Sequence, residues 1–387
     1  MKPLEGLRIL TVEQFGAGPY GSLFLADLGA DVIKIENADT GGDAARGGGP
    51  YPLGDNDSLY FQGWNTNKRS VTLDLKSAGG RAALHRLVAG ADAIMQNLRG
   101  DQAVKLGLDY ASLAPVNAKI VCGHISAYGR DNERASRPGY DFLMQAEAGL
   151  MSLTGDPDGD PARFGPSIID FMTGVTLDVG LLACLLRAQR TGIGCDVDTS
   201  LFDVALHQLN YAATWYLNRG HAATRLARSS HFSATPVQTF QAKDGWIFVM
   251  CMTEKFWRLL AETIGRPDLL NDARFADMES RSVHREALTA ELDRAFQDRT
   301  VAEWITLLGP FIPIGPVYDI AQALESPFVE TIGMVRQVPH PLLPDMRLLA
   351  NPLRIDGERP EQAVCSALGA DNDALLEDMA GARSETV

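Results

Sequence analysis

Cysteine is scarce and scattered in this chain of 387 residues. The cysteines are odd in number and never form a Cys-x-x-Cys pair; they are Cys122, Cys184, Cys195, Cys251 and Cys365. This pattern argues against a disulfide framework and against a zinc site, and it favours a reducing compartment. Residues 1–5 also lack the apolar run of a secretory signal. We therefore expect a cytoplasmic protein that carries no metal.

Positive charge is also in short supply, with 35 lysines and arginines against 49 acidic residues and a formal charge of -14. A protein this acidic does not attract nucleic acid or an anionic membrane through its overall field, so we expect neither partner. A phosphate-bearing ligand would need a local cationic patch. The most apolar helix-like stretch, 175–186, contains Asp178 and falls short of the roughly 20 apolar residues that span a membrane. It is typical of a buried core helix.

The chain length and the 45% apolar content predict two domains with ample material for packed cores. The first third of the chain alternates strand-like and helix-like segments. This βαβ order predicts an α/β fold with a mostly parallel sheet and right-handed crossovers. We expect strands at 8–12, 31–35, 70–75, 93–95, 119–125 and 195–198, and helices at 20–28, 80–88 and 170–190.

A different pattern follows the polar stretch 219–233. Asp244-Gly245 lies between two strand-like runs and predicts a β-hairpin. Three helices are expected after it, at 254–263, at 281–296 and from Thr300, and then an edge strand at 312–317. We predict a large domain over 1–216, a smaller α+β domain over 217–327, and a C-terminal segment, 328–387, that returns to the large domain.

The segment Gly16-Ala17-Gly18-Pro19-Tyr20-Gly21 is a literal G-x-G-x-x-G between a strand and a helix, and Glu36 ends the next strand. In dinucleotide-binding proteins, such a turn places a pyrophosphate on the helix N-terminus, and the acidic residue binds a ribose. The second interpretation is a tight turn that needs glycine for geometry alone. The motif leaves both open, but we find no catalytic motif of a dehydrogenase after it.

Cationic side chains recur near the expected C-terminal ends of strands, where ligands bind in an open α/β sheet. Lys68 and Arg69 precede one strand, Lys76 ends it, and Arg99 and Lys105 follow the next. Two phosphate groups would need several such donors. The competing interpretation is a solvated charged loop, which is the usual fate of a Lys-Arg pair.

Asp170 opens the long apolar helix, directly after Ile168 and Ile169. One interpretation is an N-cap that binds backbone N–H groups. The other is a carboxylate nucleophile, which the helix N-terminus keeps ionised while apolar neighbours remove its water. Such a carboxylate can attack a thioester carbonyl and form a covalent anhydride. Spacing alone does not choose between the two.

Two segments are especially distinctive, Leu28–Glu36 and Asn67–Ser70 with Leu73–Lys76, and Gln96–Arg99 follows them. Further pieces lie along nearly the whole chain at Pro3–Leu10, Gly18-Pro19, Gly139–Asp141, Asp170, Val197–Leu201, His231, Pro236, Asp244-Gly245 and Ile314–Val317. Taken in this order, they resemble the family III CoA-transferases (CaiB/BaiF type), the family of formyl-CoA transferase and α-methylacyl-CoA racemase.

The resemblance implies an enzyme with a Rossmann-like large domain built from both chain ends, a small domain between them, and two subunits interlocked into a homodimer. It places the catalytic aspartate at Asp170 and implies no cofactor beyond the CoA thioester substrates. By the same comparison, the CoA-binding residues are Gly16, Ala17, Leu73, Asp74, Leu75, Lys76, Asn97, Leu98, Arg99, Lys105, Arg137, Gly139, Tyr140 and Asp141.

Two departures from the family pattern bear on the reaction. The racemase branch has a histidine where this chain has Tyr140, and a phenol with a pKa of about 10 is a poor proton shuttle at neutral pH. The oxalate-type transferases have a run of glycines in the small domain, which the segment 251–255 lacks. We therefore expect transfer rather than racemisation, and a substrate other than oxalate or formate.

The reaction that the resemblance favours moves CoA from a short acyl-CoA, such as succinyl-CoA, to a small mono- or dicarboxylic acid. It would pass through aspartyl anhydrides and an aspartyl-CoA thioester. Arg228 and His231 either recognise a second carboxylate or serve only the solubility of a linker. The alternatives are an acyl-CoA racemase or epimerase, an NAD-dependent oxidoreductase and a non-catalytic CoA-binding subunit.

Overall fold

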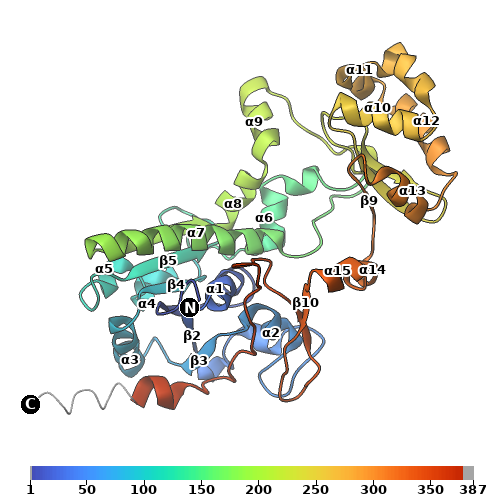
Figure 1. The fold of residues 1–387 in the computed structure, drawn as a ribbon. Coiled ribbons are helices and arrows are strands. Elements are labelled where there is room, and N and C mark those ends of the chain that lie inside the picture. Colours follow the sequence, from blue (N-terminus) through green and yellow to red (C-terminus); the bar gives the residue numbers. More distant parts are fainter. Residues whose placement is uncertain (1, 378–387) are drawn as a thin grey trace, which may run out of the picture. The chain divides into compact units, whose positions relative to one another are not determined.

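The computed structural model describes residues 2–377, and the chain divides into two compact units (Figure 1). The larger unit comprises the chain up to Ala148, Gly165–Gln208 and the part from Pro327 on; the smaller comprises Gly149–Phe164 and Leu209–Ser326. The structure thus groups 149–164 and 209–216, which we expected in the large domain, with the smaller unit. The later division falls at a helix break, where Asn210 has a φ of 41°. Residues 378–387 of the expected C-terminal segment lie outside the described residues.

The larger unit is built on six parallel strands in the order β3-β2-β1-β4-β5-β6. This is the strand order of the Rossmann fold, in which the direction of winding reverses between β1 and β4. The prediction of an α/β fold with a parallel sheet is confirmed, and the strand ends differ from the expected ones by a few residues. The strands are β1 (Arg8–Val12), β2 (Asp31–Glu36), β3 (Arg69–Thr72), β4 (Ala93–Gln96), β5 (Val121–Ser126) and β6 (Cys195–Ser200).

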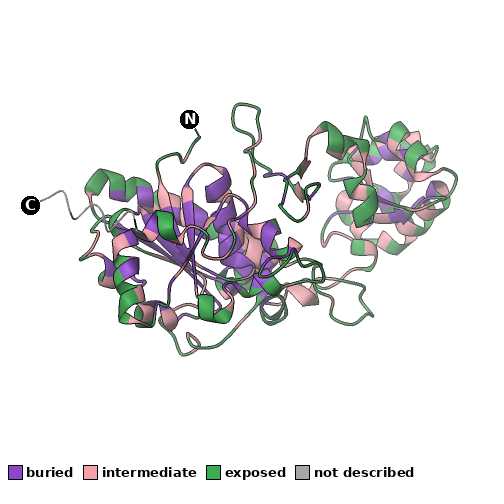
Figure 2. Cartoon of the chain, turned by 90° about the horizontal axis from the view of Figure 1, so that it is seen from below, coloured by how far each residue is buried: buried purple, intermediate pink, exposed green. Residues whose placement is uncertain are grey.

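Helices cover both faces of this sheet, which is why its central strands are apolar and buried (Figure 2). Cys122 of β5 belongs to a core cluster with residues of α3, whereas a Cβ on the next residue, Gly123, would meet Leu177 and Leu181 of α7. Because successive strand residues face opposite sides, α3 and α7 lie on opposite faces. The helices of this unit are α1 (Ala17–Asp27), α2 (Leu59–Asn65), α3 (Ala78–Ala89), α4 (Gln102–Leu106), α5 (Tyr110–Leu113), α6 (Asp141–Glu147), α7 (Ile168–Thr191), α8 (Leu201–Gln208) and α15 (Pro327–Thr331).

Helix α7 is long and apolar enough to cross a membrane by length and composition alone. In the structure, one of its sides packs against α1, β5 and β6. This packing accounts for the apolar sequence that predicted a core helix. The other side leaves Val179 and Leu186 67% and 55% exposed, respectively.

The last described segment of the larger unit returns to the edge of the sheet. After the two-stranded pair β10 (Val335–Gln337) and β11 (Arg347–Leu349), the chain reaches the free side of β3. There Asp371 accepts a hydrogen bond from the Ser70 N–H at 2.9 Å, and Asn372 accepts one from the Thr72 N–H at 2.8 Å. These side chains satisfy backbone donors that an edge strand would otherwise expose.

The smaller unit has an antiparallel sheet, β7-β8-β9, packed against helices. The hairpin predicted around Asp244-Gly245 is confirmed by the pairing of β7 with β8. The single helix expected at 281–296 is wrong, because the chain interrupts it at His284. The elements are β7 (Val237–Gln241), β8 (Trp246–Met250), β9 (Ile314–Pro316), α9 (Asn210–Arg219), α10 (Glu254–Thr263), α11 (Met278–Val283), α12 (Arg285–Phe296), α13 (Val301–Leu308) and α14 (Ile320–Leu324).

Candidate active site

Two cavities lie side by side at the carboxyl edge of the parallel sheet, and Gln14 and Leu98 line both of them. The first, of about 260 Å³, we call the aspartate cavity. Eight of the predicted site residues line it: Gly16, Ala17, Asn97, Leu98, Arg99, Gly139, Tyr140 and Asp170. The second, of about 300 Å³, we call the lysine cavity, and five predicted residues line it: Leu73, Asp74, Leu75, Lys76 and Leu98. The loops after β1 and β4 form their shared wall, at the point where the winding of the sheet reverses.

Asp170 is the third residue of α7 and lies in the wall of the aspartate cavity. It is therefore not the N-cap, a position that Ser167 takes. We expected the helix N-terminus to keep this carboxylate ionised, but burial raises the pKa of Asp170 to about 7, and the nearby Asp141 carboxylate adds to the rise. Near neutral pH, the side chain can therefore exist as a poorly hydrated carboxylate, the reactive form of such a nucleophile.

Asp141 has a structural task that the sequence did not reveal. Its side chain is buried, and its Oδ2 atom accepts hydrogen bonds from the N–H groups of Ile169 at 2.6 Å and Asp170 at 3.1 Å. Its Oδ1 atom accepts from the amide of Gln145 at 2.6 Å. Asp141 thus satisfies the first turn of α7 from a neighbouring segment, and it does not line either cavity.

Each glycine of the G-x-G-x-x-G segment makes room for a neighbour. A Cβ on Gly16 would collide with the Asp170 carboxylate, and one on Gly18 would lie 3.0 Å from Asn97 and Glu13. A Cβ on Gly21 would lie 2.8 Å from the carbonyl oxygen of Gly174 in α7. Gly16 and Gly21 therefore let α1 and its preceding turn approach the helix that carries Asp170, and Gly18 lets α1 approach the ends of β1 and β4.

Glu36 is not available for a ribose. Its two carboxylate oxygens accept from Arg46 at 2.8 Å each, and its Oε2 atom also accepts from the Ser70 hydroxyl at 2.6 Å. The side chain is buried in this cluster. The acidic residue that completed the dinucleotide pattern is thus occupied by a structural ion pair.

The turn after β1 is held tightly beside Asp170. The amide of Asn97 donates to the Gln14 carbonyl at 2.7 Å and accepts from the Gln14 N–H at 2.9 Å. Phe15 has a φ of 56°, and its ring meets that of Tyr140 edge-on, with centroids 6.4 Å apart. Positive φ is rare for a bulky residue, and such strain is concentrated at functional sites.

The cations of the predicted patch have different roles: some line a cavity and others form structural ion pairs. Lys76 lines the lysine cavity, and Arg99 lines the aspartate cavity. Lys68 is neither a ligand-facing nor a solvated side chain, because it is buried and its Nζ lies 2.9 Å from Glu13. Arg69 contacts Asp31 and Asp371.

Four other candidates are not among the residues that line the two cavities. Lys105 pairs with Asp101 at 2.5 Å, and Arg137 is exposed. In the smaller unit, both guanidinium NH groups of Arg228 donate to Asp293 at 2.7 Å, while His231 Nδ1 accepts from the N–H groups of Ser233 and Ala234. Arg228 and His231 thus have structural partners within their own unit, a role that neither sequence-based interpretation included.

Sequence reasoning missed other residues that line the cavities. They include Phe15, Ser126, Ala127, Pro138 and Leu201 in the aspartate cavity, and Asn37, Thr40, Asp43 and Gln102 in the lysine cavity. Asn37, Ala127 and Leu201 directly follow β2, β5 and β6, and Phe15 and Thr40 lie a few residues beyond β1 and β2. Applying the rule that ligands bind after strand ends to every predicted strand would have found these five, but not Pro138, Gln102 or Asp43, which lie farther along the chain.

The chain matches the family model described as CoA-transferase family III over residues 4–372. It is 34% identical to the acetyl-CoA:oxalate CoA-transferase of Acetobacter aceti, over 92% of each chain. It is 32% identical to the succinyl-CoA:mesaconate CoA-transferase of Haloarcula marismortui, over 100% of this chain and 98% of that protein. A solved CaiB/BaiF family protein from Brucella suis superposes with a TM-score of 0.84 at 31% identity, covering 98% of this chain and 99% of that one.

The fold and the site define an α/β enzyme with a partly buried carboxylate in the ligand crevice of a doubly wound sheet. The family match extends over almost all of that enzyme, so the resemblance inferred from the sequence is confirmed. The chain belongs to CoA-transferase family III, and it is a CoA-transferase.

Proposed function

We propose that a CoA thioester binds across the two cavities and that Asp170 accepts its acyl group. The observation that best supports this proposal is the position of the Asp170 carboxylate, which lies in a cavity that adjoins a second cavity lined by Lys76. The anionic nucleotide end of CoA fits beside Lys76, and the thioester end fits beside Asp170. Leu98 and Gln14, which line both cavities, would contact the pantetheine arm between the two ends.

The proposed reaction has four steps, and each forms one bond and breaks one. The Asp170 carboxylate attacks the donor carbonyl, the C–S bond breaks, and the CoA thiolate leaves a mixed anhydride. The thiolate then attacks the aspartyl carbonyl and releases the donor acid, which gives an aspartyl-CoA thioester. The acceptor carboxylate displaces the thiolate from it to form a second anhydride. The thiolate finally attacks the acceptor carbonyl, which yields the new acyl-CoA and restores the carboxylate.

Two features support negative charge during these steps. Helix α1 begins at Ala17, beside Asp170, and a helix N-terminus stabilises an oxyanion. Arg99 lines the same cavity and suits a carboxylate of the acceptor. The relatives are named for succinyl, acetyl, mesaconate, glutarate and oxalate substrates. We accordingly propose a short acyl-CoA, such as succinyl-CoA, as donor and a small mono- or dicarboxylic acid as acceptor.

Asp170→Ala tests this function. The variant should lose at least about a thousandfold in transfer rate while keeping its affinity for CoA, because only the nucleophile is removed. Asp131→Ala, at an exposed aspartate, is the matched control. Hydroxylamine added during turnover should leave a hydroxamate on Asp170, detectable by mass spectrometry. Full activity of Asp170→Ala would contradict the role of this residue.

The substrate pair can be found with a matrix of acyl-CoA donors and carboxylic acid acceptors, read by mass spectrometry. Transfer should require an acceptor acid. Exchange of the α-hydrogen of an acyl-CoA with deuterated water, without any acceptor, would instead support the racemase alternative.

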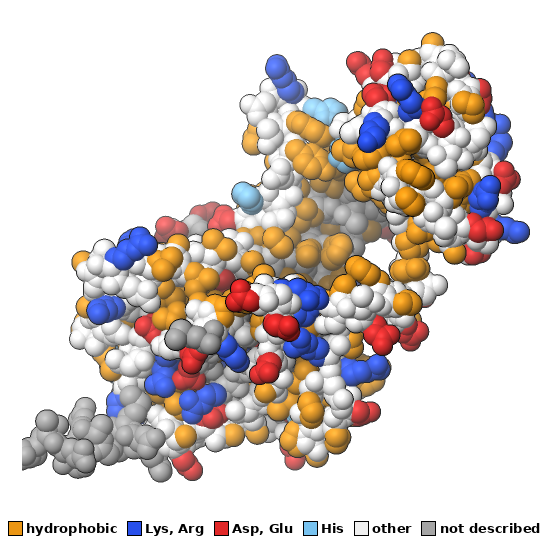
Figure 3. All heavy atoms as spheres, in the orientation of Figure 1, with side chains coloured by type: hydrophobic (Ala, Val, Ile, Leu, Met, Phe, Trp, Pro, Cys, Tyr) orange, Lys and Arg blue, Asp and Glu red, His pale blue; other side chains and the backbone are white. Residues whose placement is uncertain are grey.

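We also propose that the enzyme is a homodimer, as the family resemblance implies, with the two chains interlocked. A helical stripe of apolar side chains, Val175, Val179, Leu182 and Leu186, runs along the outer side of α7. Figure 3 shows hydrophobic side chains gathered over this helix. A second copy of the chain would remove this surface from water.

A further inference from the structure

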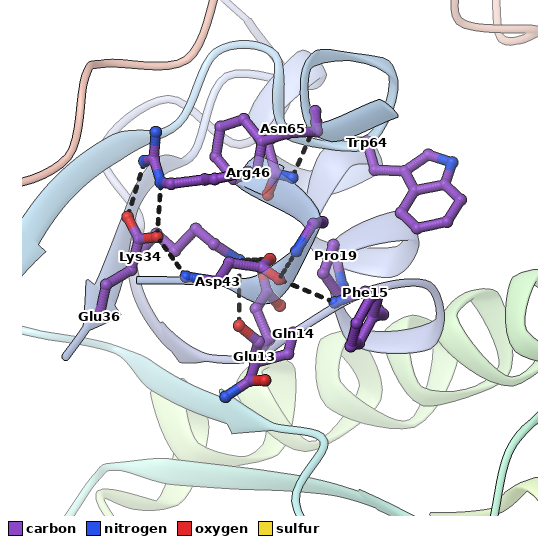
Figure 4. A network of polar contacts seen from close by, with 12 residues as sticks. Glu13, Gln14, Phe15, Pro19, Lys34, Glu36, Asp43, Arg46, Trp64 and Asn65 are labelled. Carbon is purple, nitrogen blue, oxygen red and sulfur yellow. Dashed lines mark hydrogen bonds and ion pairs between the residues drawn. The ribbon is translucent and has the colours of Figure 1, made fainter. Parts of the chain in front are cut away.

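Beside the lysine cavity, which Glu13 and Asp43 line, lies a group of buried ions that the proposed reaction does not use (Figure 4). The side chains of Lys34 and Asp43 are fully shielded from solvent, and their charged atoms are 2.9 Å apart. Glu13 and Lys68 are equally shielded and also 2.9 Å apart. Removing ions from water carries a large desolvation penalty, which only well-satisfied geometry offsets. The arrangement therefore raises the question of what these ions hold in place.

Asp43 joins two loops of the sheet edge. Its Oδ1 atom accepts from the N–H of Phe15, after β1, at 3.1 Å, and from the N–H of Ala45 at 2.9 Å. Its own N–H donates to Glu36, at the end of β2, at 3.0 Å. The Lys34 ammonium fixes the second carboxylate oxygen. These contacts together fix the orientation of Asp43.

The residue that Asp43 holds is strained. Phe15 has a φ of 56°, which a bulky side chain adopts only where its surroundings enforce it. In this conformation, the Phe15 ring faces Tyr140, and the next residue, Gly16, lies against the Asp170 carboxylate. The hydrogen bond to Asp43 therefore fixes the wall of the aspartate cavity where the acyl group would be bound.

Asp43 itself lines the other cavity. It lies in the wall of the lysine cavity with Asn37, Thr40 and Lys76, whereas Phe15 and Gly16 line the aspartate cavity. A ligand that spans both cavities would lie against both the wall that contains Asp43 and the turn at Phe15 and Gly16. Binding at the nucleotide end can then order the turn beside the nucleophile, as remote binding energy does in many enzymes.

We propose that Asp43 is a positioning residue that couples occupancy of the lysine cavity to the shape of the Phe15–Gly16 turn beside Asp170. This inference rests on the proposed binding of CoA across the two cavities. Asp43 does not contact the reacting atoms, so it acts through Phe15 and Gly16.

The test compares Asp43→Asn with the unaltered enzyme on two donors, succinyl-CoA and succinyl-pantetheine, which lacks the nucleotide. Asp43→Asn should lower kcat for succinyl-CoA by at least about tenfold, and kcat for succinyl-pantetheine by a much smaller factor. The ratio of kcat for succinyl-CoA to kcat for succinyl-pantetheine would therefore fall. Asp39→Asn, an exposed aspartate of the same loop, should preserve the ratio of the two rates. Equal losses with both donors, or no loss with either, would overturn the proposal.

A second measurement needs no variant and applies even if Asp43→Asn fails to fold. Adenosine 3′,5′-bisphosphate, a probe for the nucleotide end, should slow hydrogen exchange of the Phe15 and Gly16 amides in the unaltered enzyme at least about threefold. Unchanged exchange at a saturating probe concentration would contradict the coupling. Asp170→Ala tests only the nucleophile, so the proposed function and the coupling can fail independently.

Discussion

At the level of single residues, two carboxylates share the start of α7. Asp141 accepts hydrogen bonds from the N–H groups of Ile169 and Asp170, so its carboxylate lies at the positive, N-terminal end of α7. Asp170 lies beside it in the cavity wall and has its pKa raised to about 7 by burial first and by Asp141 second. The surroundings thus keep the proposed nucleophile close to its protonation midpoint at physiological pH.

This raised pKa predicts that Asp170 destabilises the folded protein in alkaline solution. A carboxyl whose pKa rises from 3.8 to about 7 on folding binds its proton more tightly in the folded state, so its contribution to stability falls as pH rises through 7. The asparagine of Asp170→Asn does not titrate. The free energy of unfolding of this variant minus that of the unaltered enzyme should therefore rise by about 2–3 kcal/mol between pH 5 and pH 8. Denaturant unfolding at the two pH values measures this difference. A constant difference would show that Asp170 keeps an ordinary pKa.

At the level of elements, the position of the site depends on how closely α1 crosses α7. Gly21 of α1 faces the carbonyl oxygen of Gly174 in α7, and a Cβ on Gly174 would collide with the carbonyl oxygen of Ala17. These contacts fix the distance between the two helices, and hence that between the turn at Gly16 and Asp170.

Gly174→Ala should therefore push the helices apart. We expect a loss of about 1–3 kcal/mol in free energy of unfolding, since backbone atoms must shift, together with a loss of transfer activity. Gly79→Ala is the matched control, because its added Cβ would meet nothing within 4 Å inside α3. That control should gain up to about 1 kcal/mol, since glycine is a poor helix former. Equal effects of the two substitutions, measured by denaturant unfolding, would exclude a special role for the crossing.

The sequence predicted the elements better than the contacts between them. Strands such as Arg8–Val12 are buried on both faces and therefore contain consecutive apolar residues, here Ile9 and Leu10, a pattern that is visible without a structure. Asp170 was also identified, and the structure places it in a cavity. The cap formed by Asp141 and the pairing of Lys68 with Glu13 were not predictable, because they join residues far apart in the chain. No local spacing encodes such contacts, and the same local pattern fits a solvated loop.

At the level of the whole molecule, the exposed stripe on α7 predicts association with a second copy. Val179→Glu combined with Leu186→Glu places two charges in that stripe, and it should shift the sedimenting species from twice the chain mass to the chain mass. Val104→Glu, at a residue of α4 that is 65% exposed, is the control and should leave the mass unchanged. If the chains are interlocked, tagged and untagged copies should also fail to exchange unless they are unfolded. A monomeric unaltered enzyme would refute the proposed dimer.

The hydrogen bonds of Asp371 and Asn372 to β3 have a consequence for synthesis. Thr72 and Asn372 are 300 residues apart, and the whole smaller unit is encoded between them. During translation, β3 therefore leaves the ribosome long before the side chains that cover its free edge exist. The nascent chain therefore spends most of its elongation time with an open sheet edge, and an unpaired strand edge can pair with other chains and aggregate. Its yield in the cell should depend on chaperones that shield this edge until translation is nearly finished.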